Sequence, residues 1–164
     1  MFWINPADWN NASSAGIIDF TNASATQGVT IYDDGVYPTK LNARIYPINY
    51  FTSSQTVNIG SWQNWTLTRT VATGSEIGSA LTSSLRWYYN GQLDSKLATG
   101  SIDNITASNV NLSIARSVPW GGWFSGSIAS VYIYNVGLNS EQVLIDYNIK
   151  AAKYGLPTYT ASIG

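Results

Sequence analysis

Two tryptophans in a glycine-containing segment are the residues best suited to hold a ligand. Trp120 and Trp123 are separated by two glycines. Flat aromatic faces of this kind can stack on sugar rings or anchor a protein partner. We therefore expect a ligand-binding loop here, with the alternative that one or both tryptophans close the end of the hydrophobic core.

Acidic residues offer little for catalysis. Hydrolysis of a glycosidic bond needs two carboxylates that flank the scissile bond. The two glutamates stand apart, Glu76 in a segment of glycine and serine and Glu141 at the expected start of a helix. No expected strand carries acids at alternating positions, so we assign no catalytic residue and expect no enzyme.

A pair of aspartates is the one weak candidate for a metal site. Asp33 and Asp34 precede Gly35, and carboxylates in such a turn can hold Ca²⁺. Calcium takes about six to eight oxygen ligands, which the loops containing Asp94 or Asp103 would have to complete. The same sequence is also an ordinary turn, so Ca²⁺ is an option and no cofactor is required.

Asparagines in Asn-x-Ser/Thr triplets are candidate acceptors for N-linked glycans. Asn111 and Ser113 are expected to share the solvent face of one strand, which is compatible with a glycan. The candidate acceptors are Asn11, Asn22, Asn64, Asn104 and Asn111.

Composition excludes several other functions. The chain contains no Cys and no His, which removes disulfides, thiolate nucleophiles and Ser-His-Asp catalysis. A net charge of −1 gives no reason to expect nucleic-acid binding, and no apolar run approaches the roughly 20 residues that span a bilayer. With 45% hydrophobic and only 10% charged residues, the chain is expected to fold. A neutral surface of Ser, Thr and Asn suits an extracellular protein or the surface of a virion.

Alternation of apolar and polar residues predicts an all-β sandwich. In residues 65–71, Trp65 and Leu67 fall on one side and threonines on the other, which is expected to face water. Residues 109–114 likewise place three aliphatic side chains opposite two asparagines and a serine, and Asn90-Gly91 is a strong hairpin signal. The expected strands are residues 2–5, 16–20, 29–32, 41–46, 56–59, 65–71, 85–89, 92–98, 109–114 and 124–134.

One helix is expected over about residues 140–154. Ser140 is a suitable N-cap, Gly155 and Pro157 end the helix, and an apolar stripe includes Val143 and Tyr147. We expect this helix to lie across an edge of the sandwich. The expected domain is residues 1–155, followed by a tail of residues 156–164.

Several of these segments together resemble the laminin G-like branch of the concanavalin A-like lectin/glucanase superfamily, over residues 2 to about 148. The resemblance implies a jelly roll of two packed antiparallel sheets. Members include carbohydrate-binding modules, adhesion domains, virus and phage surface proteins and some glycosidases, and laminin G-like domains often bind calcium. The Glu-x-Asp-x-x-Glu strand of the glucanases is missing here. The segments are Phe2-Trp3-Ile4-Asn5-Pro6, Trp65-Thr66-Leu67-Thr68, Trp87-Tyr88-Tyr89-Asn90-Gly91, Leu112-Ser113-Ile114-Ala115-Arg116, Phe124-Ser125-Gly126-Ser127-Ile128, Val131-Tyr132-Ile133-Tyr134-Asn135 and Leu138-Asn139-Ser140-Glu141.

The two ends of the chain depart from the family pattern. Members usually carry one or two strands ahead of the first strand seen here, so we expect the edge beside Phe2 and Ile4 to be unpaired. In the tail, Tyr159, Ala161 and Ile163 alternate with polar residues, as in a strand. The tail either pairs with its own sheet, adds to the open edge of a neighbouring copy, or is a frayed end.

Two hypotheses of function follow. The first is a non-enzymatic structural or recognition subunit of an extracellular surface assembly, a filament or a virus particle, in which copies self-associate by strand exchange. The alternative is a lectin-like carbohydrate-binding or adhesion module that holds a glycan through Trp120 and Trp123.

Overall fold

A computed structural model describes residues 1–8, 15–22, 24, 26–33, 40–46, 49–70, 83–99, 110–118 and 120–160. The chain divides into two compact units. The first contains Met1–Ile4, Ser61–Ile102 and Ile128–Gly164, and the second contains Asn5–Gly60 and Asp103–Ser127. Two β-sheets and one short helix toward the C-terminus confirm the predicted all-β class and are consistent with a sandwich.

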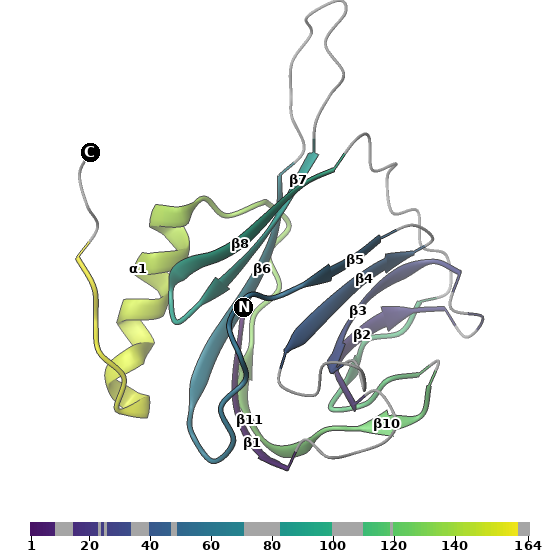
Figure 1. The fold of residues 1–164 in the computed structure, drawn as a ribbon, viewed down its shortest axis with the longest axis horizontal. Helices are drawn as coiled ribbons and strands as arrows, with labels where there is room; N and C mark the ends of the chain where they lie inside the picture. Colours follow the sequence, from purple (N-terminus) through teal and green to yellow (C-terminus); the bar gives the residue numbers. More distant parts are fainter. Residues whose placement is uncertain are drawn as a thin grey trace, which may run out of the picture. The chain divides into compact units, whose positions relative to one another are not determined.

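One sheet has five strands in the order β11-β1-β6-β7-β8 (Figure 1). Strand β6 pairs antiparallel with β1 and with β7, and β7 pairs antiparallel with β8. Asn90 and Gly91 join β7 to β8 with φ of 48° and 77°, the left-handed conformation that a tight hairpin turn requires. The strands are β1 (Phe2–Asp8), β6 (Gln63–Thr70), β7 (Ser83–Tyr89), β8 (Gln92–Thr99) and β11 (Ser125–Val131).

The other sheet has the order β10-β2-β3-β4-β5, with β9 also paired to β2. Most pairs are antiparallel, but β10 runs parallel to β2, which the sequence did not predict. The strands are β2 (Ala15–Thr21), β3 (Gly28–Asp33), β4 (Leu41–Tyr46), β5 (Asn49–Thr52), β9 (Ser113–Ile114) and β10 (Gly122–Trp123).

The N-cap of the helix lies one residue before the predicted cap. Asn139, not Ser140, is the N-cap of α1 (Ser140–Ala151): its side chain accepts a hydrogen bond from the Gln142 backbone N–H, and the Gln142 side chain accepts one from Asn139. A 3₁₀ turn, η1 (Ala152–Tyr154), continues the helix, and Gly155 ends it in the left-handed conformation as predicted.

Helix α1 covers a face of the five-stranded sheet, not its edge. Trp3 of β1 stacks on Tyr147 at 5.6 Å between ring centroids, and Tyr88 of β7 contacts Val143. The face that carries Trp3 and Tyr88 also carries the threonines of β6, because residues opposite one another in paired strands share a face. Thr66 is therefore 1% exposed and does not face water as predicted.

Three expected strands differ from those observed. Residues 56–59 form no strand, and β5 lies just before them. Of residues 110–114 only β9 is extended, and its expected inward residues Leu112 and Ile114 are 46% and 45% exposed. Strand β11 ends at Val131 rather than at residue 134. Among the described residues, no helix is long and apolar enough to cross a membrane.

Replacing the observed helix cap should destabilise the protein. Asn139→Ala removes the hydrogen bond that the Asn139 side chain accepts from the Gln142 N–H, and is expected to lower the free energy of unfolding by about 1 kcal/mol. Asn135→Ala, at an exposed asparagine of the same unit, serves as the control in place of Ser140→Ala, because Ser140 contacts the Tyr88 hydroxyl through Oγ at 3.1 Å. Urea unfolding followed by circular dichroism measures both, and equal losses would contradict the assignment of Asn139.

Candidate functional site

The two tryptophans predicted to bind a ligand lie on one hairpin, defined as residues 115–118 and 120–123. Arg116 and Trp123 form an antiparallel bridge. The Ser117 N–H donates to the Gly122 carbonyl at 2.8 Å, and the Gly121 N–H donates to the Ser117 carbonyl at 2.9 Å. Gly121 has φ of 71°, so the glycine spacing supplies the backbone conformation that closes this turn.

The hairpin is attached to strand β2 at several points. Its Ala115 N–H donates to the Ile17 carbonyl at 2.9 Å, and β10 pairs with the start of β2. A Cβ on Gly16 would lie 2.1 Å from the Ser117 nitrogen, so the two backbones touch. The Val118 N–H donates to Oδ2 of Asp19, a fully buried carboxylate, at 3.0 Å. These contacts fix the hairpin on the sheet.

The two tryptophans have different surroundings. Trp123 is 62% exposed, and the Arg116 guanidinium lies 4.9 Å from its ring centroid. Trp120 is half-buried and packs on Tyr32 with 4.7 Å between ring centroids. The hypothesis that the loop presents an aromatic surface therefore fits Trp123, whereas Trp120 is partly used in packing.

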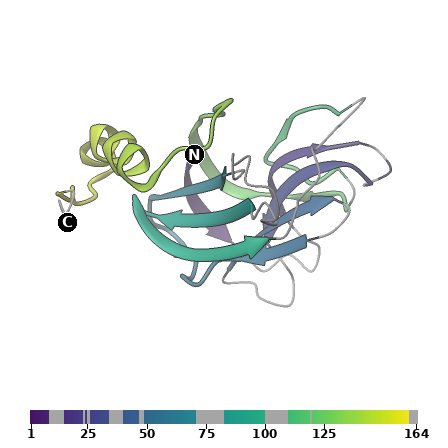
Figure 2. The same cartoon turned by 90° about the horizontal axis from the view of Figure 1, so that it is seen from above.

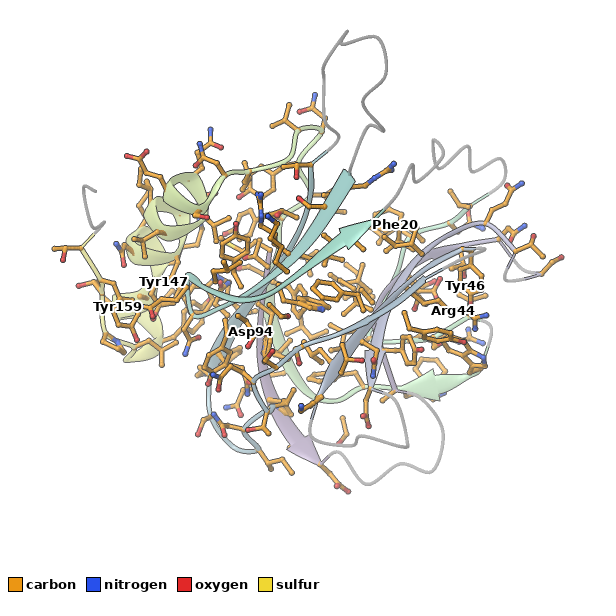
Figure 3. The ribbon with its side chains drawn as sticks, turned by 45° about the horizontal axis from the view of Figure 1, so that its top comes forward. Phe20, Arg44, Tyr46, Asp94, Tyr147 and Tyr159 are labelled. Atoms are coloured by element: carbon orange, nitrogen blue, oxygen red, sulfur yellow. The ribbon has the colours of Figure 1, made fainter. Side chains whose placement is uncertain are left out.

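Arg44 of β4 contacts three aromatic rings, and the sequence did not indicate it as a candidate site residue. Its guanidinium lies 4.3 Å from the ring centroid of Tyr46, 4.7 Å from that of Tyr50 and 5.6 Å from that of Trp120. Figure 3 shows Arg44 and Tyr46 side by side. We call these four residues the Arg44 cluster. Burial raises the pKa of Tyr46, and the charge of Arg44 opposes that rise.

The only signal for Arg44 was the alternation of residues 41–46, which puts it on the polar side of a strand with Asn42 and Tyr46. Two of the three rings that contact it come from β5 and from the hairpin. No local pattern links such distant segments, so sequence reasoning could not assemble the cluster.

The aspartate pair receives limited support as a metal site. Asp33 is fully buried on β3, while Asp34 lies outside the described residues. Among the residues that the structure describes, no three acidic side chains gather as metal ligands would. Those residues do not by themselves form a calcium site, and calcium binding at Asp33 and Asp34 stays a prediction.

The candidate glycosylation sites differ in accessibility. Asn64 is fully buried and donates a hydrogen bond to the Phe2 carbonyl at 3.1 Å, so a glycan cannot attach to the folded protein there. Asn22 is half-buried and its side chain accepts from the backbone of Thr26. Asn111 is exposed, as expected for an acceptor. Asn11 and Asn104 lie outside the described residues.

The expected open edge beside the first strand does not exist. Strand β1 lies between β11 and β6 in the five-stranded sheet, and the Tyr132 N–H extends the pairing by donating to the Met1 carbonyl at 2.8 Å. Phe2 and Ile4 are 1% and 0% exposed. Strand β11 therefore pairs with the edge of β1 that was expected to be open. Phe2 and Ile4 belong to the hydrophobic core.

The described part of the tail runs back along α1 and forms no strand (Figures 1 and 2). The Tyr159 N–H donates to Oδ1 of Asn148 at 3.0 Å, and Nδ2 of Asn148 donates to the Tyr159 carbonyl at 2.6 Å. Tyr159 also stacks on Tyr147 (Figure 3). Ala161 and Ile163 lie outside the described residues, so their expected role in assembly is untested.

Comparison with known proteins now identifies the family. The Laminin_G_3 family, described as the concanavalin A-like lectin/glucanases superfamily, matches residues 1–144. The chain belongs to this family. No curated protein matches the sequence. Among solved structures, the botulinum neurotoxin type G receptor binding domain is similar, with a TM-score of 0.53 and 16% identity over 95% of this chain and 40% of that one.

Membership in Laminin_G_3 confirms the predicted superfamily. The chain spans less than half of the neurotoxin domain, and at 16% identity that similarity concerns the fold alone. A shared fold does not assign a ligand. Among the described residues of this Laminin_G_3 domain, the hairpin and the Arg44 cluster are the candidates for ligand binding.

Adding a methyl group at Gly16 should displace the hairpin. Gly16→Ala places a carbon against the backbone of Ser117, and such overpacking costs about 1–3 kcal/mol. Unfolding measurements and the NMR signal of the Trp123 indole N–H are the readouts. Ser127→Ala, at an exposed residue of the same unit, is the control. An unmoved indole signal in Gly16→Ala would contradict the close contact.

Removing the Asn148 side chain should release the tail from α1. Asn148→Ala deletes both hydrogen bonds to Tyr159, so the Tyr159 amide should exchange with solvent at least roughly tenfold faster, a loss of about 1.4 kcal/mol. Asn135→Ala, at an exposed asparagine of the same unit, is the matched control. Unchanged exchange in Asn148→Ala would show that the tail is held by other contacts.

Proposed function

We propose that this chain is a non-enzymatic recognition module that binds a carbohydrate through the exposed face of Trp123. The observation that carries the proposal is a 62% exposed indole on a hairpin tied to strand β2. The flat face of an indole suits a carbohydrate, because sugar rings offer an apolar C–H surface that stacks on it.

Preorganisation supports this role. The Arg116 guanidinium lies 4.9 Å from the Trp123 ring and restricts the orientations of the indole. The parallel pairing of β10 with β2 fixes the backbone beneath it. A ligand that stacks on Trp123 therefore loses little affinity to the ordering of the site.

The similar solved structure gives the proposal a parallel. That protein is named a receptor binding domain, and Laminin_G_3 belongs to a superfamily named for lectins and glucanases. Of the two acids considered for catalysis, Glu141 is exposed in the first turn of α1, which is no setting for a glycosidase pair. We infer binding without hydrolysis, in an extracellular setting.

The surface-assembly hypothesis ranks second. Strand exchange beside Phe2 needed an unpaired edge, and β1 is paired on both sides. The tail would have to leave Asn148 and Tyr147 before it could join another copy. Self-association through other surfaces is compatible with a recognition module and is not required by it.

A glycan array followed by titration tests the proposal. Trp123→Ala should weaken binding of any glycan found by roughly fivefold or more, since an aromatic stacking contact is worth about 1 kcal/mol. Leu93→Ala, at a residue 53% exposed on β8, is the matched control and should bind normally. An array without binding would refute the lectin role, and binding unchanged by Trp123→Ala would refute this site.

A further inference from the structure

The Arg44 cluster lies on a polar face of the second sheet that the Trp123 proposal does not use. Asp19 is opposite Thr30, Thr30 is opposite Arg44, and Arg44 is opposite Tyr50. Residues opposite one another in paired strands point to the same face. One row across four strands therefore presents a carboxylate, a hydroxyl, a guanidinium and a phenol.

Arg44 is the available charge in this row. Among the described residues its recorded partners are three aromatic rings and the Tyr46 hydroxyl, and no carboxylate. Asp19 is already engaged, because Oδ1 accepts from the Thr21 N–H at 2.8 Å and Oδ2 accepts from the Val118 N–H at 3.0 Å. A guanidinium that contacts rings can still donate in its own plane, which suits a planar anion.

Two buried polar groups on the same face have no hydrogen-bond partner. They are Oγ1 of Thr30, which is 0% exposed, and Nδ2 of Asn42, which is 1% exposed. Asn42 is opposite Tyr32 and Thr52, in the row next to Thr30. Leaving such groups unpaired costs stability, so the sheet keeps an unpaired hydroxyl and amide next to an arginine and its aromatic neighbours.

We propose that this face binds an acidic saccharide, a sugar ring that carries a carboxylate or sulfate. The acidic group pairs with the Arg44 guanidinium, and the ring rests against Tyr50, which is 56% exposed. Sugar hydroxyls pair with Thr30 and Asn42 once the long Arg44 side chain turns toward the ligand. The site goes beyond the proposed Trp123 surface and uses different residues.

Backbone amide NMR shifts of β3 and β4 provide the test. Glucuronic acid and glucose 6-sulfate should shift them, the two probes distinguishing a carboxylate from a sulfate, and neutral glucose should not. Arg44→Gln should weaken binding at least tenfold, and Arg86→Gln on β7 should leave it unchanged. Equal shifts with glucose, equally tight binding of inorganic sulfate, or no effect of Arg44→Gln would each overturn the proposal.

A second variant separates recognition from folding. Thr30→Val keeps the shape of the side chain and removes an unpaired buried hydroxyl, so the melting temperature of the free protein should rise. Affinity for the acidic sugar should fall several-fold in the same variant. A rise in stability with unchanged affinity would exclude Thr30 from the site, and a fall in stability would show that its hydroxyl is already paired.

Failure of this proposal and failure of the Trp123 proposal can be told apart. Trp123→Ala leaves all four members of the Arg44 cluster in place, so shifts in β3 and β4 should persist in that variant. Loss of those shifts in Trp123→Ala, with Arg44 intact, would overturn the assignment of a separate acidic-sugar site.

Discussion

The position of the candidate binding residues depends on one buried carboxylate. Asp19 on β2 is fully buried, and it accepts hydrogen bonds from Thr21 on its own strand and from the Val118 N–H of the hairpin. A buried carboxylate oxygen that loses a hydrogen-bond donor keeps its desolvation cost. Moving the hairpin away from β2 would remove the Val118 donor from Oδ2, so this bond helps to hold both tryptophans in place on the sheet.

Local alternation was a good guide where each side of a strand had a distinct environment. It gave the bounds of β4 exactly as observed, and the Asn90-Gly91 turn between β7 and β8 followed from backbone sterics alone. It failed where burial depended on a distant element. Thr66 is buried because α1 covers its face, and Leu112 is exposed despite alternating with polar neighbours. Asn139 caps the helix in place of the predicted Ser140. Asparagine and serine are both good N-caps, so residue type alone could not decide between them.

Only part of the candidate site could be predicted from the sequence, because some of its residues meet only through distant elements. Tryptophans separated by glycines are recognisable from residue type, so Trp120 and Trp123 could be named in advance. The difference in their exposure could not be predicted, because Trp120 packs against Tyr32 of β3 and Arg44 of β4, which are distant in the sequence. Arg44 itself carries no local mark of function. Its significance comes from rings on its own strand, on β5 and on the hairpin, which only the strand register brings together.

The low charge of the chain determines what kind of recognition this surface can perform. Lys and Arg number 8 in 164 residues, and the net charge is −1, so no long-range field attracts an anionic ligand. Selectivity for a charged ligand must then come from close contacts, where a single guanidinium outweighs the diffuse charge of the whole protein. Arg44 and Arg116 each lie against an indole of the same hairpin. Each places one point of positive charge beside a flat apolar face, and in the proposed Arg44 site that combination favours an acidic sugar over both a free anion and a neutral sugar.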